Sequence, residues 1–217
     1  VARDRMCSTA YESVGGVVAA MEALARGEMT RAFCFIGAGG HHAGYGYFWG
    51  ACCFNDVVIA LTQVRETSPL RRFAIIDTDA HHGDGTRQLI GQDPEVLHLC
   101  FCGDDYISPD GSKIDVDVYR PHWPDPDQGY VAAVRDHLPR VLDYRPDLLV
   151  WYYGFDTHKN DYGSLGLSEK AYVQLCRLMV ETAETLKIPL QVVLGGGSLS
   201  ALATATIPGI IHQLAVS

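Results

Sequence analysis

The chain lacks the features that mark membrane, secreted and nucleic-acid-binding proteins. Its 217 residues contain no apolar run of about 18 residues and no basic leader with an apolar segment, so neither a membrane span nor a signal peptide is expected. Lys and Arg number 17 against 26 Asp and Glu, and the net charge of -9 argues against non-specific binding to nucleic acid, which needs basic patches. This acidity suits a cationic substrate or partner.

The cysteines also lack the spacing of a disulfide framework or of a Cys-x-x-Cys site. There are seven of them, an odd number, and most lie in apolar stretches. This pattern favours a reducing compartment, the cytoplasm, or the nucleus if the source is eukaryotic. Cys52-Cys53 and Cys100-x-Cys102 leave thiolate ligation or redox chemistry open, but buried thiols acting as small hydrophobic groups fit the sequence better.

The alternation of short apolar runs with longer helical patterns predicts βαβ units in an α/β fold with a mostly parallel sheet. With 47% apolar residues, the chain can bury roughly 70% of its extended surface, enough for one domain over residues 1–217. The predicted strands are Ala32–Ile36, Phe73–Asp77, Val96–Cys100, Leu148–Tyr152 and Leu190–Leu194, with a short one at Ile114–Val118 inside the loop Gly103–Gln128. The predicted helices are Thr9–Arg26, Ala51–Arg65, Tyr130–Leu142, Glu169–Leu186 and Leu199–Ala205.

Two of these helices carry capping signals. Thr9-x-x-Glu12 has the pattern of a capping box at the start of the first helix, and Gly27 follows its end. Ser168 is placed to cap the helix that starts at Glu169.

The most informative segment is Asp-Thr-Asp-Ala-His-His-Gly-Asp-Gly at 77–85, directly after an apolar run. Side chains alternate along a strand, so Asp77, Asp79 and His81 are expected on one side. Acids after a strand also cap helices, and a histidine pair can be purely structural. Charges this dense are rarely buried without partners, however, and parallel sheets bind ligands beyond the carboxyl ends of their strands. A functional site is therefore expected here.

Other chemically active residues follow other predicted strands. His41-His42, Asp156 and the glycines 195–197 each come directly after one. Together with Asp79-x-His81 they make four loops that should converge on one edge of the sheet.

Three of these side chains suit a metal ion. A catalytic zinc has three protein ligands and an open position for water. Asp79 and His81 supply two, and Asp156 is the best-placed third, although it can also be read as a loop or helix-capping acid. Two carboxylates and an imidazole leave a divalent ion Lewis-acidic enough to lower the pKa of bound water.

The histidine pair offers acid–base chemistry. His41 and His42 are two imidazoles at a strand end, although a tandem pair also suits metal ligation or a pH switch. Asp77 and Asp84 can each accept a hydrogen bond from one imidazole and fix its tautomer. His82 is expected to pack beside the site. The remaining histidines lie in no cluster and are expected to be structural: His98, His122, His137, His158 and His212.

The segments that carry these residues resemble, in order and spacing, the zinc-dependent histone deacetylase family. They are Gly39–Ala43, Gly50–Asp56, Asp77–Gly85, Gly154–Asp156 with Asp161 five residues on, and Leu194–Gly197. The resemblance runs from about Tyr11 to His212. It implies a three-layer, arginase/deacetylase-like fold, with helices on both faces of a mostly parallel sheet.

The resemblance also implies roles for individual residues. It implies a zinc ion held by Asp79, His81 and Asp156, and a catalytic pair, His41 and His42, supported by Asp77 and Asp84. It implies substrate-binding positions at Gly50, Gly154, Gly196, Gly197 and Ser198, with Ala51 where the family often has an aromatic wall. The family also holds a monovalent cation near the 77–81 segment, so the resemblance allows a potassium ion. The implied partner is an acylated lysine or polyamine, and an oligomer is allowed.

Two departures from the family pattern bear on activity. The glycine run is normally followed by a tyrosine that polarises the substrate carbonyl, whereas this chain continues Ser198-Leu199-Ser200. Losing one such donor lowers the rate by about 10²–10³. Ser198 or a loop tyrosine (Tyr45, Tyr47 or Tyr106) is a candidate substitute. The family's first strand and acidic rim loop are also missing from the start of the chain.

The leading hypothesis is a zinc amidohydrolase that removes an acetyl or other acyl group from an amine. Its alternative is a catalytically weak or inactive relative that binds zinc and acylated ligands or partner proteins. A binuclear manganese ureohydrolase would need a second Asp-x-Asp pair, where Asp156 is a single acid. A serine hydrolase built on Ser198 would need the Gly-x-Ser-x-Gly elbow, which the sequence lacks.

Overall fold

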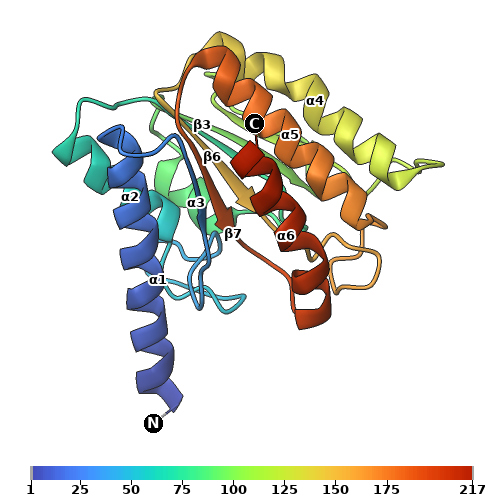
Figure 1. Ribbon diagram of the computed structural model, residues 1–217, viewed down its shortest axis with the longest axis horizontal. Coiled ribbons are helices and arrows are strands. Elements are labelled where there is room, and N and C mark those ends of the chain that lie inside the picture. The colour runs from blue at the N-terminus through green and yellow to red at the C-terminus, as the bar shows by residue number, and fades with distance from the viewer. Residues whose placement is uncertain (1, 217) are drawn as a thin grey trace.

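A computed structural model, which describes residues 2–216, shows a sheet with helices on both faces (Figure 1). Within these residues the sheet has seven strands in the order β1-β7-β6-β2-β3-β5-β4, and every pairing is parallel except that of β4 with β5. The strands are β1 Arg31–Cys34, β2 Phe73–Asp77, β3 Val96–Cys102, β4 Tyr106–Ile107, β5 Lys113–Asp117, β6 Leu148–Tyr153 and β7 Leu190–Leu194.

The central strands are almost entirely apolar because both of their faces are covered. Every residue of β2, β3 and β6 is buried. In β2, Phe73 and Ile75 face one side of the sheet and join one hydrophobic core, while Ala74 and Ile76 face the other and join a second core. The expected three-layer α/β fold is confirmed.

The helices divide between the two faces (Figure 1). α1 Ala2–Ala25 and α2 Asp56–Thr67 pack on the face of Phe73. α4 Pro126–Tyr144, α5 Glu169–Leu186 and α6 Ser200–Val216 pack on the opposite face. A short helix, α3 Asp84–Ile90, follows β2. None of the helices within residues 2–216 is long and apolar enough to cross a membrane.

The capping signals gave one correct and one wrong boundary. α5 starts at Glu169, and the Ser168 hydroxyl accepts a hydrogen bond from the Lys170 N–H, as predicted. The capping box at Thr9 is wrong, because α1 already begins at Ala2 and Thr9 lies inside it.

Other boundaries differ from the prediction for local reasons. α2 starts at Asp56 rather than Ala51, because Ala51 has a φ of 62° that no α-helix accommodates and Asn55 caps the helix. α4 begins at Pro126, whose preset φ suits the first helical turn. α6 continues through Pro208 to Val216, well beyond the predicted end at 205. α3 and β4 were not predicted, and β5 starts one residue earlier than predicted.

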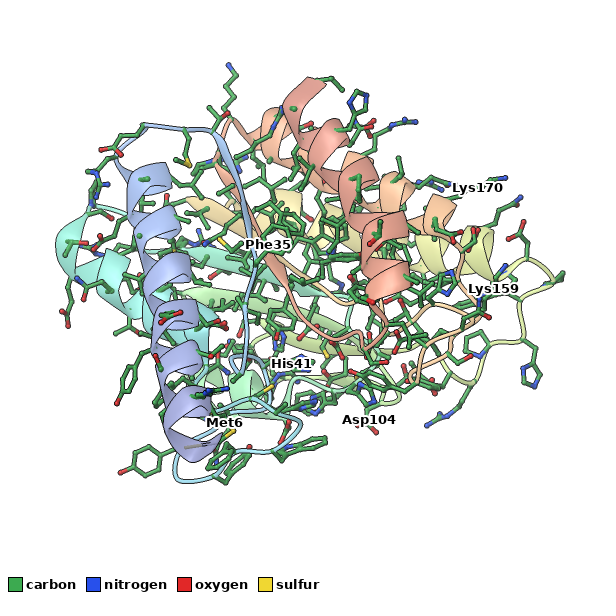
Figure 2. All side chains as sticks on the ribbon, turned by 60° about the horizontal axis from the view of Figure 1, so that its bottom comes forward. Met6, Phe35, His41, Asp104, Lys159 and Lys170 are labelled. Atoms are coloured by element: carbon green, nitrogen blue, oxygen red, sulfur yellow. The ribbon has the colours of Figure 1, made fainter. Side chains whose placement is uncertain are left out.

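The topology brings the carboxyl ends of the parallel strands to one end of the sheet. In Figure 1 the arrowheads of β6 and β7 point toward this end, and Figure 2, which turns it toward the viewer, shows His41 there. The loops after β1, β2, β6 and β7 therefore meet, as predicted for a ligand site.

Candidate active site

Asp79, His81 and Asp156 converge beyond the ends of the adjacent strands β2 and β6. One ligand atom from each lies within 4.8 Å of the others. His81 Nδ1 is 3.2 Å from Asp79 Oδ1 and 2.9 Å from Asp156 Oδ2. Both carboxylates are buried, with exposed fractions of 2% and 0%, whereas the His81 side chain is 36% exposed.

The electrostatics of this trio suit the binding of a cation. Burial and the negative charge of Asp79 raise the pKa of Asp156 to about 7. Hydrogen bonds to Asp156 and Asp79 raise the pKa of His81 to about 10. Asp156 Oδ2 is buried without a well-oriented hydrogen-bond donor among the described residues, even though His81 Nδ1 is close. Two carboxylates and an imidazole are a suitable ligand set for a divalent ion such as zinc.

Glycines let two loops close around the carboxylates. The Gly196 N–H donates to Asp79 Oδ2 at 2.6 Å, and a Cβ at Gly196 would overlap the Asp79 and Asp156 side chains. A Cβ at Gly154 would lie 2.6 Å from Asp156 Oδ1 and 2.7 Å from Asp79 Oδ2. Any side chain at these two positions would displace the trio.

Two histidine–aspartate pairs lie beside the trio. His41 Nδ1 is 2.8 Å from Asp77 Oδ2, and His42 Nδ1 is 2.7 Å from Asp84 Oδ1. The two imidazole rings are 4.1 Å apart between centroids. Because each Nδ1 is occupied by a carboxylate, each Nε2 is the atom free to exchange a proton, and His41 Nε2 lies 3.5 Å from Asp79 Oδ1.

The pKa values of the two imidazoles are shifted in opposite directions. Burial works against the charged form of His41, but the charges of Asp77 and Asp79 outweigh it and raise its pKa to about 9. Burial and the neighbouring charge of His41 lower the pKa of His42. Such a split is typical of paired groups with different roles in proton transfer.

A pocket opens above these residues, with a volume of about 370 Å³. Gly50, Gly196 and Gly197, for which the resemblance implies substrate binding, line it, and so does Ala51. Gly50 has a φ of 57°, and a Cβ there would lie 2.6 Å from the His42 ring. This volume suits a small or linear ligand.

Gly154 and Ser198, for which the resemblance also implies substrate binding, are not among the pocket-lining residues. Gly154 packs behind the Asp79 and Asp156 carboxylates instead. The Ser198 hydroxyl donates to Asp161 Oδ1 at 3.0 Å, so it is turned away from the trio. Because this partner is a carboxylate rather than an imidazole, the arrangement does not support a serine nucleophile.

Sequence reasoning missed the aromatic walls of the pocket, which are Trp49, Tyr152 and Tyr162. Trp49 packs on His42 with 3.8 Å between ring centroids, and its indole N–H donates to Asp84 Oδ2 at 2.9 Å. Tyr162 stacks on His81 at 5.4 Å. The signal for Tyr162 was its place next to Asp161, one residue past the recognised motif.

Tyr162 is a pocket tyrosine that contacts the glycine run. Its hydroxyl accepts a hydrogen bond from the Gly197 N–H at 3.4 Å. The three tyrosines considered from the sequence are not placed this way: none lines the pocket, Tyr45 is 85% exposed, Tyr106 lies on β4, and Tyr47 donates to Asp84.

His98, which the sequence placed outside the cluster, is buried behind Asp77. Its Nε2 lies 3.8 Å from Asp77 Oδ2, and its Nδ1 accepts a hydrogen bond from Arg87 at 3.3 Å. Burial lowers its pKa to about 4, so it is neutral at pH 7. His82 packs beside the site as expected, with Nε2 3.3 Å from Asp115 Oδ1.

Known proteins are similar to this chain in sequence and in fold. The chain is 32% identical over 166 residues to an uncharacterized protein of Picosynechococcus sp., covering 76% of this chain and 55% of the relative. It is 30% identical over 184 residues to a probable deacetylase of Archaeoglobus fulgidus, covering 79% of this chain and 51% of the relative. The crystal structure of acetylpolyamine aminohydrolase from Burkholderia pseudomallei superposes with a TM-score of 0.81 at 25% identity, over 95% of this chain and 62% of that one.

The chain thus spans about half the length of these two relatives. The family model described as the histone deacetylase domain matches residues 1–207. This match covers nearly the whole sequence and includes all the residues of the trio and of both histidine–aspartate pairs. The chain therefore belongs to the histone deacetylase domain family.

Proposed function

We propose that this protein is a zinc-dependent amide hydrolase that removes an acetyl or other acyl group from an amine, either an acylated lysine or an acetylpolyamine. The observation that carries the proposal is the convergence of Asp79, His81 and Asp156 next to a pocket that Asp79 and His81 line, beside two histidine–aspartate pairs. The family supports amide hydrolysis, and the similar solved structure is an acetylpolyamine aminohydrolase. The net charge of -9 favours cationic substrates.

Asp79, His81 and Asp156 would hold the zinc ion, which supplies a Lewis acid that activates water and polarises the amide carbonyl. His41 and His42 then move the protons: one imidazole takes a proton from the water, and the pair returns one to the leaving amine. Asp77 and Asp84 hold the Nδ1 atoms, so that both Nε2 atoms stay available for this transfer.

Tyr162 supplies the hydroxyl that stabilises the developing negative charge on the carbonyl oxygen. Its ring lies over His81 and its oxygen is next to Gly197, at the rim of the same pocket. A hydroxyl held in advance toward this oxygen lowers the barrier more than a mobile one would. Asp161 keeps the neighbouring loop in place by accepting hydrogen bonds from the Ser198 and Leu199 N–H groups.

The test is turnover of an acetyl-lysine peptide and of an acetylpolyamine by the purified protein, before and after removal of metal with a chelator. We expect chelation to abolish amine release and stoichiometric zinc to restore it. Asp156→Asn should stay folded by circular dichroism but release no amine with zinc present. Full turnover by the metal-free protein, or none of either substrate by the zinc-loaded protein, would overturn the proposal.

A further inference from the structure

A second group of metal-binding side chains lies outside the pocket. It comprises His82, Cys100, Cys102 and Asp115, each with a ligand atom within 4.8 Å of the others. Three of the four are buried, and His82 is partly exposed. None of them has a part in the proposed hydrolysis.

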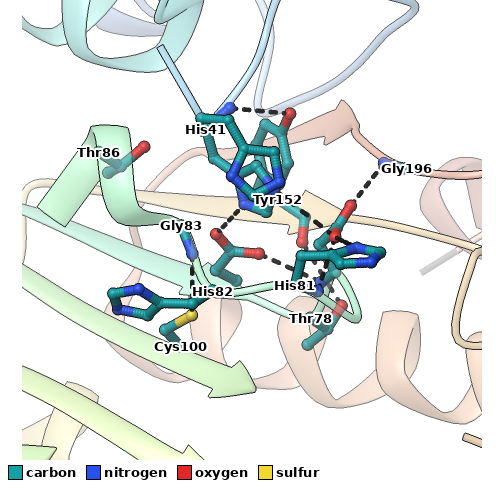
Figure 3. A network of polar contacts seen from close by, with 12 residues as sticks. His41, Thr78, His81, His82, Gly83, Thr86, Cys100, Tyr152 and Gly196 are labelled. Carbon is teal, nitrogen blue, oxygen red and sulfur yellow. Dashed lines mark hydrogen bonds and ion pairs between the residues drawn. The ribbon is translucent and has the colours of Figure 1, made fainter. Parts of the chain in front are cut away.

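The fold itself brings these four residues together. Cys100 and Cys102 are two positions apart on β3 and therefore point to the same face. Asp115 is the partner of Cys100 on the neighbouring strand β5. His82 comes from the loop after β2, on the other side of β3. Figure 3 shows the His82 ring beside Cys100, whose sulfur accepts a hydrogen bond from the Gly83 N–H at 3.5 Å.

One buried ring nitrogen of this cluster lacks a hydrogen-bond partner among the described residues. His82 Nε2 is buried and has no well-oriented hydrogen-bond partner among the described residues, although Asp115 Oδ1 is 3.3 Å away. Both thiols are completely buried, and thiols are weak hydrogen-bonding groups. A buried polar atom that remains unpaired destabilises a fold, so a partner for His82 Nε2 is expected.

The charges also balance around a divalent ion. Arg87 donates to both Asp115 oxygens, at 2.9 and 2.6 Å. Two thiolates and one carboxylate would carry three negative charges, which a divalent ion and the Arg87 guanidinium would neutralise. The carboxylate retains lone pairs for a metal while it accepts these hydrogen bonds, an arrangement common among metal-binding carboxylates.

We propose that His82, Cys100, Cys102 and Asp115 form a second metal site that binds a thiophilic divalent ion, zinc being the best match. Tetrahedral zinc with sulfur, nitrogen and oxygen ligands requires ligand atoms about 3.3–3.8 Å apart, so side-chain shifts of about 1 Å close the site. With four protein ligands, the ion has no open position and is structural.

A metal ion at this second site would hold in place the loop after β2, which carries His81. His82 directly follows His81, and the ion would tie this loop to β3 and β5. Occupancy is therefore expected to stabilise the fold and to fix the backbone at His81, without taking part in proton transfer.

Cobalt substitution tests the proposal independently of hydrolysis. Co²⁺ bound to cysteine thiolates absorbs in the near ultraviolet, whereas Co²⁺ bound only by carboxylates and imidazole does not. The metal-free protein titrated with Co²⁺ should gain this band and take up two ions per chain. Cys102→Ser should lose the band and one ion, while the matched control Cys53→Ser, a half-buried thiol elsewhere, keeps both.

A further variant separates the two sites. Asp156→Asn should lose one ion but keep the thiolate band, so failure of the proposed hydrolase site leaves this test intact. Because Cys102→Ser could fold poorly, His82→Ala provides a second variant and should weaken Co²⁺ affinity at the thiolate site at least tenfold. Absence of the band in the wild-type protein, or its persistence in Cys102→Ser, would overturn the proposal.

Discussion

Tyr162 lies over His81 with 5.4 Å between ring centroids and an interplanar angle of 28°, while its hydroxyl accepts a hydrogen bond from Gly197. This contact joins the loop after β6 to the glycine run after β7 across the mouth of the pocket. It places a phenol beside the pocket, in contact with the glycine run. The chain thus keeps a hydroxyl at the pocket although the residue after Gly197 is a serine.

Replacing Tyr162 by Phe should lower kcat by about 10²-fold and change KM little, because the hydroxyl acts on charge that develops during the reaction. Steady-state kinetics with an acetylated substrate measures this. Tyr45→Phe, at an 85% exposed tyrosine outside the pocket, is the matched control and should leave both constants unchanged. An unchanged kcat in Tyr162→Phe would exclude this role.

Asp84 positions His42 through Nδ1, so Asp84→Asn should lower kcat by about 10- to 100-fold. KM should stay within about twofold, since the carboxylate does not line the pocket. Asp136→Asn, at an exposed site on α4, should behave like the wild type. Equal losses in both variants would mean that the effect is not due to the His42 contact.

Gly196→Ala should abolish metal binding at the trio, because the added methyl group would overlap the Asp79 and Asp156 carboxylates. Calorimetric titration of zinc into the metal-free variant measures this loss. Gly15→Ala is the control: it lies in α1 with open space around it and should stabilise the fold by about 1 kcal/mol without affecting zinc. Wild-type zinc affinity in Gly196→Ala would contradict the geometry of the site.

Asp56 makes the stability of the protein depend on pH. It is completely buried, Oδ2 has no hydrogen-bond partner among the described residues, and burial raises its pKa to about 7. Since its pKa is higher in the folded state than in the unfolded chain, its contribution favours folding at low pH and is lost as the pH rises toward 7. Wild-type stability should therefore fall relative to Asp56→Asn by about 2 kcal/mol between pH 5 and pH 8.

Urea unfolding of both proteins at a series of pH values measures this difference. Comparing the two proteins at each pH removes the contribution of all other titrating groups. A difference that does not change with pH would mean that Asp56 is ionised in the folded protein throughout the range.

The sequence predicted the fold because its signals are local. Four of the five main strands, β2, β3, β6 and β7, are mostly apolar and buried, and α5 starts at Glu169 because Ser168 caps it. The predicted helix boundaries were wrong where the backbone conformation depends on contacts with distant parts of the chain. Alanine has a high helix propensity, so the sequence predicted a helix at Ala51. The positive φ that Ala51 adopts in the loop beside the pocket could not be predicted from the sequence.

The convergence of the candidate site was predictable for a topological reason. Asp79, His81 and Asp156 each follow a parallel strand, and such ends meet at one edge of the sheet. Trp49 and Tyr162 were missed because they lie in loops, where no periodicity indicates which way a side chain points. The Cys100–Cys102 pair was read as apolar packing, since only the register of β3 with β5 brings Asp115 beside it. The potassium ion, the cellular location, the single domain and the oligomeric state stay predictions.

The most direct test of the central claim is a crystal structure of the zinc-loaded protein with diffraction measured at the zinc absorption edge. The account predicts an anomalous peak bonded to Asp79, His81 and Asp156 at about 2.0–2.2 Å from each ligand atom. A zinc-loaded crystal with no peak among these three side chains would contradict it.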